Sequence, residues 1–171
     1  PGFRTLATNG TPFEISRVGT GTFEAVAGFG NDGLVLDPDP NIAGTQIQEI
    51  PVVGMDPPSS YTLSGHFKVT SAVQILGPGA TTVDPITGSP TFRWTAYPQA
   101  DQYRVVLWDG ITDGTSWIKD AVTGTSLAYD GPALTNGYIY QWRVEALATT
   151  PILRELSHSE DQLGVFQAIQ P

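Results

Sequence analysis

Hydrophobic and polar side chains alternate along residues 134 to 146, where a turn at Asn136-Gly137 opens directly into the pattern. Successive side chains of a strand point to opposite sides of its sheet. One face of this stretch therefore carries Tyr138, Tyr140, Trp142, Val144 and Ala146, and the other carries Ile139, Gln141, Arg143 and Glu145. An aromatic face opposite a mostly polar one predicts a central strand of an antiparallel sheet that is packed on one side.

The rest of the chain predicts many short strands and almost no helix. No long window repeats apolar residues at the spacing of three and four that a helix requires, and 19 glycines and 14 prolines punctuate the sequence. We expect strands at 12–18, 22–29, 34–36, 46–53 and 61–76, and then at 91–95, 102–108, 116–119, 126–129, 138–147 and 164–168. The predicted fold class is all-β.

Turn residues divide this series. Gly30-Asn31-Asp32-Gly33 favours positive φ and predicts a hairpin connection, and the alternating prolines of 37–41 predict a loop. Residues 77–90 hold three prolines and three glycines without apolar alternation, which indicates a linker or the first edge of a domain. We therefore expect two tandem antiparallel β-sandwich domains of the immunoglobulin-like kind, at 1–77 and 78–171.

The first of these regions resembles a carboxypeptidase regulatory-like domain, a small transthyretin-like sandwich. The resemblance rests on Asn9-Gly10, Phe13-Glu14-Ile15, Val18 and the run 21–27. Such domains begin with further strands, and only residues 1–8 precede the Asn-Gly turn here. This difference predicts an incomplete domain from a longer protein, with an exposed sheet edge through which the chain could self-associate.

The second region resembles a fibronectin type III domain over residues 90 to 169. The motifs are Thr91-Phe92-Arg93-Trp94, Tyr103-Arg104-Val105, and a corner with Leu134, Gly137, Tyr140 and Val144. The resemblance implies that Trp94 and Tyr103 fill the core and that the Tyr140 hydroxyl bonds a backbone group. Residues 148–162 form a longer loop than the family has between its last two strands, and such loops often carry function.

Charge and composition exclude some partners. A net charge of -9 with eight basic residues argues against binding nucleic acid or anionic lipid. Without cysteine, the chain has no disulfide and no thiolate chemistry. No apolar run approaches the ~20 residues that a membrane-spanning helix needs.

Three groups of residues are candidates for binding. Asp32, Asp37 and Asp39 could supply oxygen ligands to calcium, although turn chemistry alone also explains them and we favour it. Trp108 and Trp117 could stack on a sugar ring or anchor a protein, or pack within the fold. His158 lies among serines and acids, and a surface-loop histidine is the simpler explanation. Arg104, Arg143 and Glu145 are expected to form a charged cross-strand surface.

No catalytic set emerges from these residues, and we expect no enzyme. The two resemblances imply a structural, adhesive or spacer role, with a protein or glycan partner at a bacterial cell surface. They imply an extracellular or surface location, including attachment in the periplasm or at the outer membrane. One alternative is a carbohydrate-binding module that uses exposed aromatic rings, and a remote one is a hydrolase that uses His158.

Overall fold

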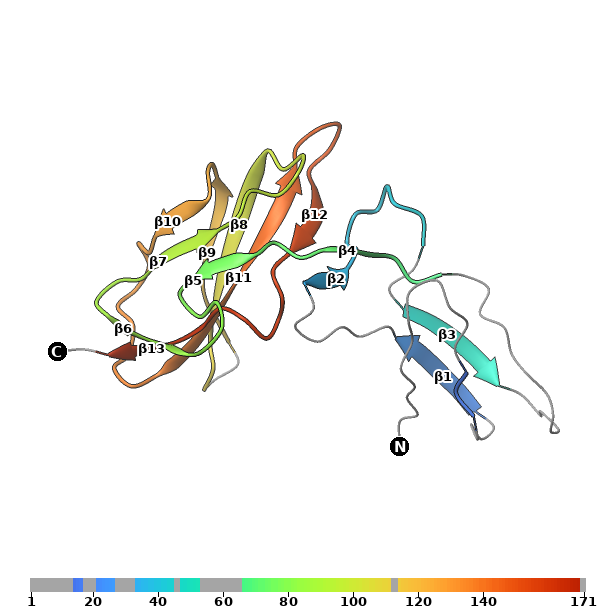
Figure 1. Ribbon diagram of the computed structural model, residues 1–171, viewed down its shortest axis with the longest axis horizontal. Helices are drawn as coiled ribbons and strands as arrows, with labels where there is room; N and C mark the ends of the chain where they lie inside the picture. The colour runs from blue at the N-terminus through green and yellow to red at the C-terminus, as the bar shows by residue number, and fades with distance from the viewer. Residues whose placement is uncertain are drawn as a thin grey trace.

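The computed structural model describes residues 14–16, 21–26, 33–44, 47–52, 66–111 and 114–169. These residues form thirteen strands and no helix (Figure 1). The all-β prediction is therefore confirmed for the part of the chain that the structure describes.

Two sheets of residues 74–169 pack face to face, and we call them and their loops the two-sheet body (Figure 1). The larger sheet has the order β6 (Asp84–Thr87), β13 (Val165–Ile169), β11 (Ile139–Ala148), β8 (Gln102–Asp109) and β9 (Gly114–Val122), and β12 (Arg154–His158) also pairs with β11. The smaller sheet has the order β10 (Ser126–Ala128), β7 (Thr91–Trp94) and β5 (Ile75–Gly77). All pairs are antiparallel except β6 with β13.

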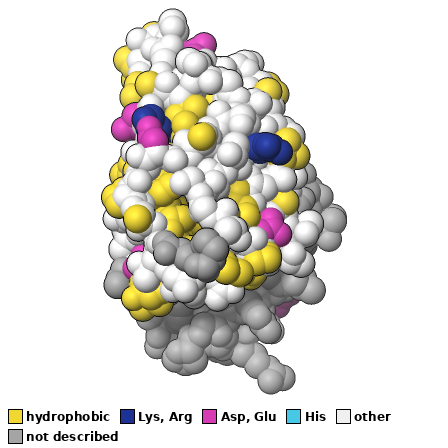
Figure 2. Space-filling view, turned by 90° about the vertical axis from the view of Figure 1, so that its left-hand side faces the viewer, with side chains coloured by type: hydrophobic (Ala, Val, Ile, Leu, Met, Phe, Trp, Pro, Cys, Tyr) yellow, Lys and Arg dark blue, Asp and Glu magenta, His cyan; other side chains and the backbone are white. Residues whose placement is uncertain are grey.

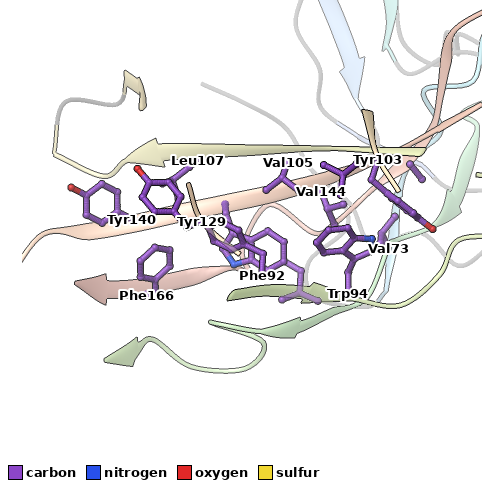
Figure 3. Close-up of a cluster of buried hydrophobic side chains, with 14 of the residues drawn as sticks. Val73, Phe92, Trp94, Tyr103, Val105, Leu107, Tyr129, Tyr140, Val144 and Phe166 are labelled. Carbon is purple, nitrogen blue, oxygen red and sulfur yellow. The ribbon is translucent and has the colours of Figure 1, made fainter. Parts of the chain in front are cut away.

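The core lies between these sheets, as Figure 3 shows. Strand β11 is central, and its predicted inner face supplies Tyr140, Trp142, Val144 and Ala146 to the core. The expected core residues are also in place, with the rings of Trp94 and Tyr103 5.4 Å apart. At the corner before β11, the Thr135 amide donates to the Tyr140 hydroxyl at 2.9 Å. These residue-level predictions are confirmed.

In the described residues, four strands precede the two-sheet body. β1 (Gly21–Val26) pairs antiparallel with β3 (Ile47–Val52), and β2 (Leu34–Leu36) pairs antiparallel with β4 (Val69–Ser71). The hairpin expected at 30–33 is therefore wrong in the described residues, because β1 and β2 each take a later partner. Residues 14–16 belong to no strand, although a strand was expected over 12–18, whose other residues lie outside the described part.

Three further local predictions differ from the structure. The stretch 61–76 is not one strand, since β4 and β5 are separated at residues 72–74. For 77–90 the linker alternative is wrong and the edge alternative agrees with the structure, because the stretch contains the edge strand β6, where the missing donor of Pro85 is tolerated. The expected loop 148–162 contains β12, so the connection from β11 is a short hairpin.

Candidate functional site

The strongest cluster of polar contacts outside the core ties β2 and β4 to the β12 side of the two-sheet body (Figure 1). The Val73 amide donates to the His158 carbonyl at 2.9 Å, and the Ser157 hydroxyl donates to the Ser71 carbonyl at 2.7 Å. The Thr70 and Tyr97 hydroxyls are 2.6 Å apart. We call this cluster, together with the ion pair between Asp39 and Arg154, the joint.

The ion pair at the joint is largely shielded from water. Arg154 Nε lies 3.2 Å from Asp39 Oδ2, and the two side chains are only 14% and 10% exposed. Lys68 Nζ donates to the Asp39 carbonyl at 2.6 Å, so two cations hold this loop. Removing one partner of such a shielded pair leaves the other charge buried without compensation, so the pair strongly favours one arrangement of the joint.

The aspartates proposed as calcium ligands bond within the protein. Asp37 Oδ1 accepts the Asp39 amide at 2.8 Å, and Asp39 Oδ1 accepts the Asn41 amide at 2.9 Å. With Arg154 on the second oxygen, both carboxylate oxygens of Asp39 have protein donors. Asp32 lies outside the described residues, within which no three acidic or imidazole side chains are placed to share a metal ion.

The two tryptophans proposed as a binding pair lie on opposite faces of the larger sheet. Trp117 pairs with the inward-facing Leu107, and its ring lies 6.0 Å from Phe92 and 5.0 Å from Tyr129. Trp108 lies on the outer face, where the Arg143 guanidinium sits 5.4 Å from its ring centroid. The structure therefore does not bring the two rings onto one surface.

The expectation of a surface-loop histidine is wrong, because His158 belongs to strand β12 and its ring contacts a neighbour on the same strand. His158 Nδ1 lies 2.8 Å from Glu155 Oε1. The adjacent serines are fully buried: the Ser157 hydroxyl donates to a carbonyl in the joint, and the Ser159 hydroxyl accepts the Val144 amide at 3.2 Å. Both serine hydroxyls therefore bond backbone groups, and the His158 carbonyl accepts a bond from the Val73 amide in the joint.

The outer face of the larger sheet carries a continuous series of ion pairs, which confirms the expected charged surface. Arg104 contacts Asp120 at 2.5 Å and Glu145 at 3.3 Å, and Arg143 contacts Glu145 at 3.0 Å and Asp161 at 3.5 Å. The bond that the Arg104 guanidinium donates to Asp120 raises the pKa of Arg104. The two Arg104 pairs join β8 to β9 and to β11, whereas Arg143 pairs with Glu145 on its own strand and with Asp161 in the loop after β12.

The end of the two-sheet body opposite the joint has two shallow hollows, of about 170 and 310 Å³, and both include Ser89. Neither contains any of the residues proposed from the sequence as a binding site. Figure 2 shows that charged side chains are sparse on this end and that apolar ones lie in separate groups. The residues that line these hollows do not indicate a particular ligand.

Comparison with protein-family models, with curated proteins and with solved structures gives no match. Within the described residues, no helix has the length and apolar character needed to cross a membrane.

Sequence reasoning did not find the joint. Arg154 lies in a segment expected to be a loop, and Thr70 and Tyr97 are separated by 27 residues without a motif that connects them. Asp39 and Arg154 are separated by 115 positions, and no local signal indicates their pairing. The proline-rich loop 37–41 was the one visible indication, since it fixes the backbone around Asp39.

Proposed function

We propose that this chain is a non-catalytic spacer or adhesive module of an exported or cell-surface bacterial protein. In this proposal, two immunoglobulin-like β-sandwiches stand in tandem, the second similar to fibronectin type III domains and the first to carboxypeptidase regulatory-like domains. The observation that carries the proposal is the joint, which fixes the segment before the two-sheet body to that body through backbone, hydroxyl and ion-pair contacts.

The path of the chain supports a spacer. The joint lies at one end of the two-sheet body, and the strand β13 ends at the opposite end (Figure 1). A module that receives the chain at one end and releases it at the other sets a distance between its neighbours. A joint with a shielded ion pair would also fix the orientation of the preceding segment relative to the two-sheet body, which a flexible linker would not do.

The tryptophans support a structural role over a glycan platform. Trp94 and Trp142 are fully buried, and Trp117 packs against the core. Trp108 is half-buried on the outer face, with Arg143 over its ring. A flat sugar-binding platform requires at least one open ring face, and among these four rings only the half-buried Trp108 and Trp117 retain exposed surface.

Tryptophan fluorescence of the purified chain, with iodide as quencher and soluble polysaccharides as ligands, tests this proposal. We expect weak quenching that no polysaccharide changes, and a Trp108→Phe variant should lose the part of the quenchable signal that the half-buried Trp117 does not carry. A polysaccharide that protects the wild-type chain from iodide, and fails to bind Trp108→Phe, would replace the spacer proposal with the carbohydrate-binding one.

A further inference from the structure

Two distant segments run side by side in the same direction through the two-sheet body. The incoming segment, residues 71–87, follows the joint, and the outgoing segment, residues 157–169, leads to the end of β13. Their contacts occur in the same order along both segments. Ser71 contacts Ser157, Val73 contacts His158, Gly79 contacts Gly164, and β6 pairs with β13 from Asp84 with Phe166 to Thr87 with Ile169.

The middle of this parallel run depends on two glycines. The Gly164 amide donates to the Gly79 carbonyl at 2.8 Å, and both residues have positive φ, +75° and +77°. A Cβ on Gly79 would lie 2.3 Å from the Val165 backbone nitrogen. The Trp142 indole adds a bond of 2.9 Å to the Pro78 carbonyl, which fixes the incoming segment to the central strand. The two segments are therefore closely packed at Gly79 and Gly164, between the joint and β6.

The direction of the run determines how it responds to tension. A pull on the chain before the joint and after β13 draws the two segments in opposite directions along their common axis. Every bond between parallel segments is then loaded at once, in shear. If the same segments were separated from one end, their bonds would break in succession, each carrying the load alone.

We propose that the two-sheet body is a load-bearing element, in which the parallel run between the incoming and outgoing segments resists tension along the chain. This inference rests on the proposed spacer function and adds that the spacer transmits force. The partner that it implies at each end is a mechanically anchored neighbour, such as a cell wall on one side and an adhesive contact on the other.

Pulling single molecules from two positions tests the inference directly. The chain has no cysteine, so introduced thiols are unique attachment points. One variant carries Thr82→Cys, just before β6, and a cysteine added after Pro171, which loads β6 and β13 in shear. The matched control carries Ser89→Cys, just after β6, with the same second thiol, so that the same pair of strands is peeled from one end. Thr82 and Ser89 are both exposed.

Forced unfolding is governed by the unfolding rate, and we expect the mean unfolding force to be at least about twofold higher for the Thr82 attachment than for the Ser89 attachment. Far-UV circular dichroism verifies that both variants are folded before they are pulled. Equal forces, or a higher force for Ser89, would overturn the load-bearing inference. The spacer proposal would survive that result, because it depends on order at the joint, which is measured without force.

Discussion

Gly79→Ala is expected to lower the free energy of unfolding by about 3 kcal/mol or more, among the largest effects of a single methyl group in this chain. The new Cβ would lie within 2.3 to 2.7 Å of the Val165 and Gly164 backbone, which has no flexible side chain to move aside. Relief of that clash requires the loss of the bond from the Gly164 amide to the Gly79 carbonyl. Urea unfolding monitored by far-UV circular dichroism measures the change.

Gly88→Ala is the matched control for this substitution. Gly88 has φ +80°, close to +77° at Gly79, but a Cβ there has no heavy atom within 4 Å. The Gly88→Ala variant should therefore lose only the free energy of unfolding that alanine costs at positive φ, about 1 kcal/mol. If the two alanine variants lose equal stability, the close approach of the incoming and outgoing segments does not contribute, and the parallel run is less tightly packed than described.

Trp142→Ala should also be severely destabilising, by about 3–5 kcal/mol. The side chain is fully buried, and its ring centroid lies 4.8 Å from that of Phe92. Its removal creates a cavity between the sheets and leaves the Pro78 carbonyl without its indole donor. The free energy of unfolding is measured by circular dichroism in urea, since fluorescence itself changes with the substitution.

Trp108→Ala provides the comparison on the opposite face of the same sheet. The half-buried Trp108 ring contacts the Arg143 guanidinium, an interaction that contributes about 0.5–1 kcal/mol at such sites. We expect Trp108→Ala to lower the free energy of unfolding by about 0.5–1 kcal/mol. A Trp108→Ala variant as unstable as Trp142→Ala would mean that the outer face of the larger sheet is packed against another part of the chain.

The residues that build the core could be predicted because their signals are local. Alternation over 138–146 indicates both the inner face of β11 and its central place, and the tyrosine at the corner bonds the backbone as expected. Trp94 and Tyr103 lie on strands whose patterns are equally regular. Alternation along a single strand predicts the inner face of β11, whereas the places of Trp94 and Tyr103 and the bond of Tyr140 were implied by short motifs that resemble a fibronectin type III domain.

The joint and the parallel run could not be predicted because they depend on pairs of segments that are distant in sequence. β6 contains Pro85, so it does not show the alternation or composition of a strand, and only its partner β13 makes it one. β12 carries the fully buried polar residue Ser157, whose hydroxyl donates to the Ser71 carbonyl in the joint. Similarly, turn chemistry was the favoured explanation of the aspartates of the loop 37–41, and their bonds within the loop agree with it, but Arg154 is a partner that arrives from 115 residues away.

The joint is expected to hold its two sides in one arrangement. The most direct test is a distance distribution between spin labels attached at Ala43→Cys and Thr123→Cys. Both positions are exposed, Ala43 beside the Asp39 loop and Thr123 between β9 and β10. We predict a single narrow distribution that broadens in Arg154→Ala, which removes the ion pair with Asp39, and stays narrow in the exposed control Arg93→Ala. A broad distribution in the chain with native Asp39 and Arg154 would contradict the spacer account.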